Sequence, residues 1–241
     1  MADDLTGFLA AREPTPDRPL LGLTVLVVED SRFACDAMRL LCLRSGARIR
    51  RADCLRSARR HLMSYRPTVV IVDLGLPDGS GLDLIAEIAL RRPRVPALLA
   101  TSGNDDAEGA ALDAGADGFL RKPIDSLSSF QQTVLTALPV TPRPVTAGIT
   151  ASESDQVRPD PLALRDDLAR VADLLGHRPD GADLDYLAQF LSGIALSADD
   201  APLREAALAL ARDRRQGRDP GADVARIDGL VRKRLAVGAS F

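Results

Sequence analysis

Polar residues of four kinds follow four apolar, strand-like runs of the sequence, at the point where each run ends. They are an acidic pair (Glu29 and Asp30), a single acid (Asp73), two hydroxyl residues (Thr101 and Ser102) and a lysine followed by proline (Lys122 and Pro123). The carboxyl ends of parallel strands meet at one edge of a sheet, so a parallel sheet would bring all four groups together. Charged residues flank many buried strands, and any one group alone would fit that simpler reading. Acid, acid, hydroxyl and lysine at successive strand ends together favour a functional site.

The three acids predict a magnesium site. Clustered carboxylates repel one another unless a cation lies between them, and Mg²⁺ prefers oxygen ligands while keeping several waters. Glu29, Asp30 and Asp73 could supply that set together with a backbone carbonyl just beyond Asp73. A bound cation would keep Asp73 ionised. An ionised carboxylate that attacks a phosphoryl group forms an aspartyl phosphate.

Lys122 and Thr101 fit the same chemistry. Phosphoryl transfer needs in-line positioning and positive charge on the equatorial oxygens, so Lys122 would neutralise one oxygen and the Thr101 hydroxyl would donate to another. The chain has 29 arginines and two lysines, Lys122 and Lys233. Lysine at this point therefore departs from the chain's usual choice of cation, and a planar guanidinium does not replace a compact ammonium.

Strands alternating with helices would position these residues. The predicted strands are Thr24–Val28, Ala47–Ala52, Val69–Val72, Ala97–Thr101 and Gly118–Arg121. The predicted helices are Ser31–Ser45, Leu55–Tyr65, Leu82–Leu90, Asp105–Ala114 and Leu127–Leu138. Five such β–α units predict an α/β fold with a five-stranded parallel sheet, wound on both faces by helices.

The motifs VLVVED, VIVDLGLPDGSG, LLATSG and GFLRKP resemble those of receiver domains of bacterial two-component response regulators. The resemblance covers 20–138, about half of the chain, and implies a flavodoxin-like fold. It implies that Asp73 is the phosphorylation site and that Thr101 and Lys122 sense the phosphoryl group. It also implies that Glu29, Asp30, Asp73 and the carbonyl of Gly75 bind Mg²⁺, that Phe119 is a switch aromatic, and that the Lys122–Pro123 peptide is cis. Gly75 and Gly103 are small compared with what is usual at these positions in the family.

The resemblance further implies a function and its partners. Asp73 would receive a phosphoryl group from a sensor histidine kinase or a phosphotransfer protein, with Mg²⁺ as the cofactor. Such a chain is a signalling protein and not an enzyme, beyond its own phosphorylation and dephosphorylation. The first residues lack the basic and apolar parts of a secretory signal, and no apolar run approaches about 18 residues. We therefore expect a cytoplasmic protein without a membrane partner.

Composition divides the chain into four parts. Residues 1–19 are polar and contain prolines, as in a flexible arm, and 20–138 are the part that resembles a receiver domain. Residues 139–160 are predicted to be a Pro-rich linker, and 161–241 a helical output or interaction domain. In the last part, apolar residues recur at helical spacing over Pro161–Leu175, Leu184–Leu196, Pro202–Arg214 and Val224–Leu235. Four helices of this length predict a small all-α module, closed within the chain or completed by dimerisation.

The function of 161–241 is less clear from sequence. Residues 151–241 hold 13 basic and 16 acidic residues, which argues against DNA binding, although 211–218 (ARDRRQGR) could contact phosphate. His177 lies in a predicted turn, which disfavours phosphotransfer through a histidine. The main hypothesis is a module that acts by contact with a partner protein or by homodimerisation. The alternative is a transcriptional regulator whose C-terminal helices bind DNA.

Two further expectations concern side chains. The cysteines (Cys35, Cys42 and Cys54) are odd in number and lack metal-binding spacing, so all three are predicted to be small buried hydrophobes. Phosphorylation is expected to draw Thr101 and Phe119 toward Asp73. That movement would remodel the face formed by the fourth helix, the fifth strand and the fifth helix of the receiver domain.

Overall fold

The computed structural model describes residues 13–104, 106–139, 155–177 and 179–237. Most of the predicted arm and most of the predicted linker lie outside these residues. Within the described residues, no helix has the length and apolar character needed to cross a membrane.

Five parallel strands form the central sheet, in the order β2-β1-β3-β6-β7. They are β1 (Thr24–Val28), β2 (Arg48–Ala52), β3 (Val69–Asp73), β6 (Ala97–Ser102) and β7 (Gly118–Arg121). The three middle strands are continuous apolar runs, as expected of strands buried on both faces. The predicted fold class is confirmed, and each predicted strand is present with its bounds shifted by at most one residue.

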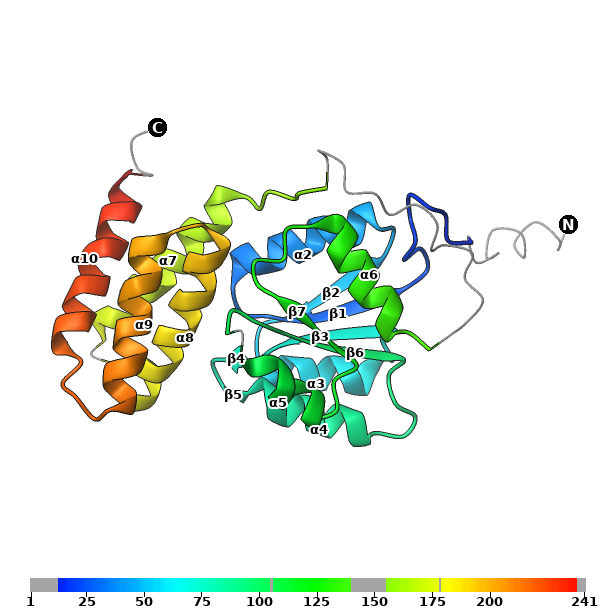
Figure 1. Ribbon diagram of the computed structural model, residues 1–241, viewed down its shortest axis with the longest axis horizontal. Coiled ribbons are helices and arrows are strands. Elements are labelled where there is room, and N and C mark those ends of the chain that lie inside the picture. Colours follow the sequence, from blue (N-terminus) through cyan, green and yellow to red (C-terminus); the bar gives the residue numbers. More distant parts are fainter. Residues whose placement is uncertain (1–12, 105, 140–154, 178, 238–241) are drawn as a thin grey trace, which may run out of the picture.

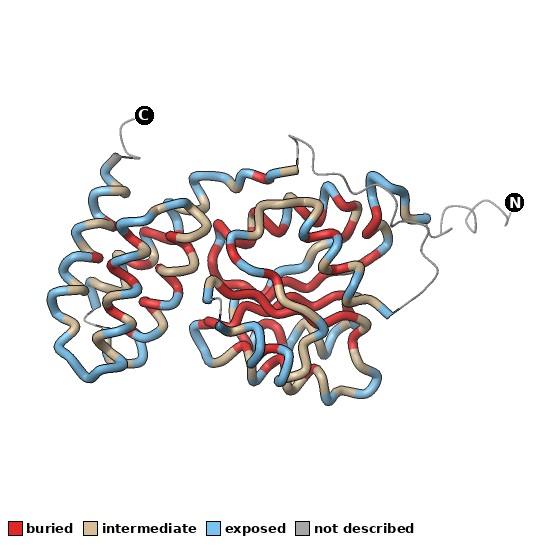
Figure 2. Tube along the Cα trace, in the orientation of Figure 1, coloured by how far each residue is buried: buried red, intermediate tan, exposed pale blue. Residues whose placement is uncertain are grey.

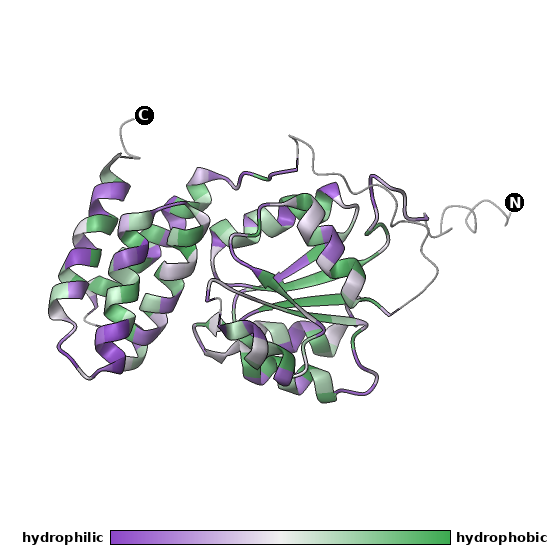
Figure 3. Ribbon diagram, in the orientation of Figure 1, coloured by the Kyte–Doolittle hydropathy of each residue, from purple (hydrophilic) through white to green (hydrophobic). Residues whose placement is uncertain are grey.

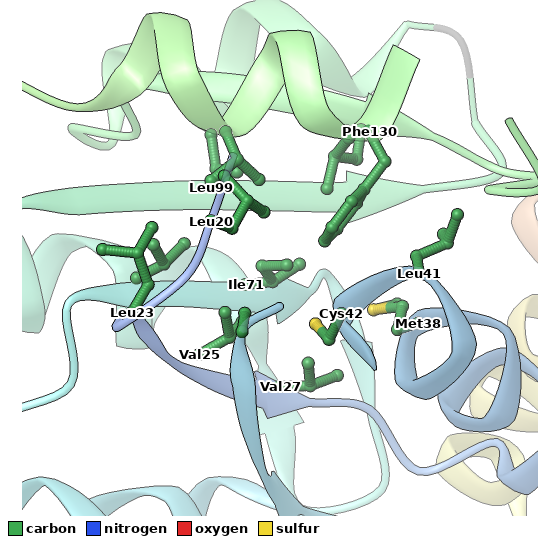
Figure 4. Packing of buried hydrophobic residues seen from close by; sticks show 14 of the residues in the cluster. Leu20, Leu23, Val25, Val27, Met38, Leu41, Cys42, Ile71, Leu99 and Phe130 are labelled. Carbon is green, nitrogen blue, oxygen red and sulfur yellow. The ribbon is translucent and has the colours of Figure 1, made fainter. Parts of the chain in front are cut away.

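Helices cover both faces of the sheet (Figure 1). One face carries α2 (Arg32–Arg44) and α6 (Leu127–Ala137); the other carries α3 (Leu55–Ser64), α4 (Gly81–Leu90) and α5 (Ala107–Asp113). Successive side chains of a strand point to opposite faces, so β1 contributes to two cores. Val25 and Val27 belong to the core under α2 and α6, and Leu26 and Val28 to the core on the other face. Figure 4 shows the first of these cores, where Met38 and Leu41 from α2 and Phe130 from α6 pack beside the strands.

A short antiparallel hairpin follows β3 and was not predicted. It consists of β4 (Gly75–Leu76) and β5 (Gly79–Ser80). Gly79 has a φ of +143°, which favours glycine. A Cβ atom on Gly81 would lie 2.0 Å from the carbonyl oxygen of Asp73. The glycines of the DGSG motif thus let the chain turn back tightly beside the end of β3.

Four further helices form a bundle beside this α/β unit (Figure 1). They are α7 (Pro161–Gly176), α8 (Gly181–Ser197), α9 (Ala201–Arg215) and α10 (Gly221–Val237). Asp160, Asp180 and Asp200 cap the first three with side chains that accept from backbone N–H groups, as is usual at helix starts. All four predicted helices are present, and three begin one to three residues earlier than predicted. They share one core, which includes Leu187, Leu191, Leu210, Ile227 and Val231, so the bundle closes within a single chain.

The bundle and the segment that precedes it contact the α/β unit through several elements. Residues 155–160, predicted as part of a linker, pack against the start of α6: Val157 is buried, and Asp155 accepts from Ser126 and Ser128. In addition, α7 and α8 pack against α2, and α8 packs against β4. Buried residues run along β1, β3 and β6 and recur inside the bundle (Figure 2). These three strands are strongly apolar, whereas β2 carries three arginines (Figure 3).

Candidate functional site

The structure brings together the three acids that the sequence places at strand ends. Glu29 and Asp30 follow β1, and Asp73 is the last residue of β3. Each offers one carboxylate oxygen, and these three oxygens all lie within 4.8 Å of one another. All three residues are buried. The parallel register of β1 and β3 produces this cluster, because it aligns Val28 with Val72, immediately before the acids.

Lys122 lies directly against this cluster. Its Nζ is 2.7 Å from Oε2 of Glu29 and 3.1 Å from Oδ2 of Asp73. Burial alone would lower the pKa of Lys122, but the carboxylates of Asp73 and Glu29 raise it above its ordinary value. The lysine is therefore held as a cation, and its peptide to Pro123 is cis, as the resemblance implied.

Thr101 lies beside Asp73 in the sheet. The register of β3 and β6 pairs these two residues. Thr101 is fully buried, and its hydroxyl has no hydrogen-bond partner within the described residues. A buried hydroxyl is usually hydrogen-bonded. The missing partner of the Thr101 hydroxyl therefore indicates that a ligand binds here and accepts its hydrogen bond.

The electrostatics of the acids favour a bound cation. Burial raises the pKa of Glu29 to about 7, and the charge of Asp73 acts in the same direction. Burial also raises the pKa of Asp30 to about 7, with Glu29 adding to the effect. For Asp73, burial raises the pKa while Lys122 opposes the rise. Within the receiver domain itself, three carboxylates and one lysine leave excess negative charge that a divalent cation would neutralise.

The donor set also fits Mg²⁺. Oδ1 of Asp30 is buried without a hydrogen-bond partner within the described part of the chain, which leaves one carboxylate oxygen available. Oxygen atoms from three acids match the preference of this hard cation. Gly75 lies on β4, is buried, and donates its N–H to Asp73. Gly75 therefore lies beside the cluster, while its carbonyl as a metal ligand stays a prediction.

Phe119 lies on β7, next to the strand that carries Thr101. It pairs with Ala100 in the sheet, is partly buried, and packs against the core under α4. Its place agrees with the sequence prediction, while its role as a switch aromatic stays a prediction.

Comparison with known proteins agrees with this geometry. Residues 25–133 match the family model described as the response regulator receiver domain. These residues form a receiver domain.

Relatives match less than half of the chain. Similar proteins include the KDP operon transcriptional regulatory protein KdpE of Escherichia coli, with 34% identity over 100 residues, 41% of this chain and 44% of that protein. The response regulator protein PilR of Pseudomonas aeruginosa is 36% identical over 114 residues, 47% of this chain and 25% of that protein. A response regulator from Chloroflexus aurantiacus aligns with a TM-score of 0.42 and 25% identity, covering 47% of this chain and 91% of that one. The chain spans less than half the length of these curated relatives.

The bundle adds residues to the receiver's acidic cluster that sequence reasoning missed. The hydroxyl of Tyr186 on α8 donates to Oδ2 of Asp30, and Nη1 of Arg170 on α7 lies 3.3 Å from the same oxygen. Nη2 of Arg170 also donates to the Tyr186 hydroxyl at 2.9 Å. Helical periodicity does not reveal which polar residues of a bundle face another domain, so these contacts had no signal in the sequence.

Asp167 on α7 binds the start of α2, just beyond the acidic pair. Its carboxylate accepts from the Ser31 hydroxyl at 2.8 Å and from the backbone N–H groups of Arg32 and Phe33 at 2.9 and 3.0 Å. Asp167 is only 1% exposed. A carboxylate at a helix N-terminus satisfies orphan N–H groups and interacts favourably with the helix dipole, so this contact holds α7 against the receiver domain.

The remaining predicted residues are placed as follows. Cys35 and Cys42 are buried as predicted, but Cys54 is only partly buried because its Sγ caps α3, accepting from the backbone N–H of Ser57. His177 is exposed at the C-terminal end of α7, outside the helix, as predicted, and its Nδ1 lies 2.6 Å from the carbonyl oxygen of Asp173.

Proposed function

We propose that this protein is a two-component response regulator that accepts a phosphoryl group on Asp73. The observation that carries this proposal is the convergence of Glu29, Asp30, Asp73 and Lys122 at one buried edge of the sheet, with the orphaned hydroxyl of Thr101 beside them. The phosphodonor would be a sensor histidine kinase or a phosphotransfer protein, and the protein would act in signalling and not as an enzyme on other substrates.

Each residue has a role in the transfer. An oxygen of Asp73 forms a bond to phosphorus as the bond between phosphorus and the donor's nitrogen breaks, and the electron pair of that bond stays on the nitrogen. Lys122 neutralises one equatorial oxygen, and the hydroxyl of Thr101 donates to another. Glu29, Asp30, Asp73 and the carbonyl of Gly75 would hold Mg²⁺, which supplies charge neutralisation. Phe119 would follow Thr101 inward and alter the face formed by α5, β7 and α6.

We further propose that 20–138 and 161–241 are separate domains and that the second acts on a partner protein, with homodimerisation as one form of this output. The bundle supports this because it has its own closed core and no basic excess. A DNA-binding output is the second candidate, since KdpE is named a transcriptional regulatory protein. That similarity covers 41% of the chain. A salt-dependent affinity for DNA would favour the second candidate.

The assignment of Asp73 is tested by labelling with a small phosphodonor such as acetyl phosphate in the presence of Mg²⁺. Intact mass should show one phosphoryl group on the wild type and none on Asp73→Asn. Asp53→Asn is the matched control, because Asp53 follows β2 at the same edge of the sheet but is exposed, and it should be labelled like the wild type. Labelling of Asp73→Asn at the wild-type level would refute the assignment.

A further inference from the structure

The helical bundle covers the edge of the receiver domain where phosphorylation takes place. Asp73 and Lys122 are each only 7% exposed. The cavity that remains around them has a volume of about 20 Å³ and is lined from the bundle side by Gln189, Phe190 and Gly193 of α8. A space of that size holds about one water molecule. It is too small for a phosphoryl group with a hydrated cation.

Small residues in the receiver domain let α8 come this close. A Cβ atom on Gly75 would lie 2.4 Å from the side-chain amide of Gln189, and one on Gly103 would lie 3.3 Å from Leu196. Gly193 of α8 lies at the same contact, where an added Cβ would be in ordinary van der Waals contact, 3.9 Å from Nζ of Lys122. The two glycines that distinguish this receiver domain from the usual pattern are therefore the positions over which α8 packs.

The bundle also places a positive charge where a cation would act. Arg170 lies 3.3 Å from Oδ2 of Asp30, and its guanidinium is held over the ring of Phe190 at 5.3 Å from the centroid. Tyr186 donates to the same Asp30 oxygen and stacks on Phe190, with ring centroids 5.5 Å apart. A divalent cation bound by Asp30 would be repelled by Arg170 at this short distance. It would also compete with both donors for that carboxylate.

Resting on the proposed function, we propose that the α7–α8 face is an intramolecular cover that binds the metal-free, unphosphorylated acidic edge and is displaced by divalent cation and phosphorylation. Arg170 and Tyr186 hold Asp30, Asp167 holds the start of α2, and α8 closes over Asp73. Cover and cation compete for one carboxylate, so each weakens binding of the other by the same factor. On release, the aromatic and arginine side chains of this face become available to a partner.

The two tyrosines allow this to be tested directly. The chain has no tryptophan, and Tyr65 and Tyr186 are its only tyrosines. Tyr65 lies at the end of α3, where its hydroxyl contacts His61. In Tyr65→Phe, all tyrosine emission comes from Tyr186, whose emission is quenched while its hydroxyl donates to a carboxylate. We expect Mg²⁺ to increase this emission with the same midpoint as binding of Mg²⁺ measured by calorimetry. Saturated Mg²⁺ binding without a change in emission would overturn the proposal.

Variants of the cover provide the second measurement. Tyr186→Phe keeps the stacked ring but removes the hydroxyl, and Arg170→Gln removes the charge. Each should tighten Mg²⁺ binding about tenfold, because a hydrogen bond to a charged group contributes free energy of that order. The matched controls are Tyr65→Phe and Arg232→Gln, the latter because Arg232 is exposed and pairs with Asp228 within α10; both should bind Mg²⁺ like the wild type.

The variants also separate this proposal from the proposed function. If neither cover variant binds Mg²⁺ more tightly than the controls, the cover does not compete with the cation, even when Asp73 is still labelled by acetyl phosphate. If Asp73 is not labelled while the cover variants do bind Mg²⁺ more tightly, the proposed function fails and the competition stands. Circular dichroism of each variant establishes that the helices are intact.

Discussion

The hydroxyl of Thr101 is buried at the end of β6 and makes no hydrogen bond within the described residues. Burying a polar group without a partner costs about 1–3 kcal/mol, so the unphosphorylated protein is less stable than it would be with an apolar group of the same shape. A phosphoryl-binding site accounts for this cost. The acceptor for the Thr101 hydroxyl would be a phosphoryl oxygen, which is present only when the phosphoryl group is bound.

Thr101→Val tests this reading of the threonine. Without Mg²⁺ and phosphodonor, we expect the free energy of unfolding of the variant to equal or exceed that of the wild type by about 1 kcal/mol, as measured by urea titration. Thr101→Ser, which keeps the hydroxyl, should show no such gain. A loss of more than about 1 kcal/mol in Thr101→Val would mean that the hydroxyl has a partner in the resting protein.

Two buried thiols give a second prediction. Burial raises the pKa of Cys35 and of Cys42 to about 12. Because the thiolate is the reactive form, both stay protonated at neutral pH and should resist alkylation by iodoacetamide until the protein unfolds. Cys54, which is only partly buried, should be labelled first. Peptide mapping after a short reaction checks this, and modification of Cys35 or Cys42 ahead of Cys54 would contradict it.

Among the secondary-structure elements, β1 and β3 could be predicted because the residues on both faces of each strand are apolar. β1 and β3 are unbroken runs of Val, Ile, Leu and Thr before their acids, and a short apolar run rich in β-branched residues is typical of a buried strand. The β4–β5 hairpin has two residues on each strand, too few for any periodicity. The sequence shows the glycines in the loop after Asp73, but it does not show the pairing of β4 with β5 that these glycines allow.

The start of α9 allows a prediction on the bundle. The side chain of Asp200 caps this helix, accepting from the backbone N–H of Leu203 at 3.1 Å, and pairs with Arg234 of α10. Asp200→Ala should lower the free energy of unfolding by about 1–2 kcal/mol, the usual effect of losing a helix cap. Asp200→Asn keeps a capping oxygen and should lose less. The exposed pair in α10 is the control: Asp228→Asn should cost less than about 0.5 kcal/mol.

The effect of Asp200 also depends on pH. Burial alone would raise its pKa, but Arg234 and the N–H of Leu203 lower it below the ordinary value of 3.8. The stabilisation from the charged form is therefore complete above about pH 4 and is lost as pH falls through the lowered pKa of the folded state. The difference in unfolding free energy between wild type and Asp200→Asn should shrink below about pH 4. A difference that grows there would contradict this assignment.

For the whole molecule, the sequence predicted the two units but not how they meet. The acids, Thr101 and Lys122 were identifiable because a parallel sheet fixes where strand ends lie. Asp167, Arg170 and Tyr186 were not, because a helix pattern shows only which residues are apolar. The contact of α7 and α8 with α2 depends on a few polar residues, and the close packing of α8 on the receiver domain depends on Gly75 and Gly103. The role of these residues can be recognised only when both surfaces are known.

The central claim is that phosphorylation of Asp73 and the closed arrangement of the bundle exclude each other. Small-angle scattering on the full chain, with and without Mg²⁺ and beryllium fluoride as a phosphoryl mimic, tests it most directly. Light scattering on the same samples separates opening from dimerisation. We predict that the radius of gyration per chain increases in the wild type and stays constant in Asp73→Asn. An unchanged wild-type profile, on protein shown by calorimetry to be saturated with both ligands, would contradict the claim.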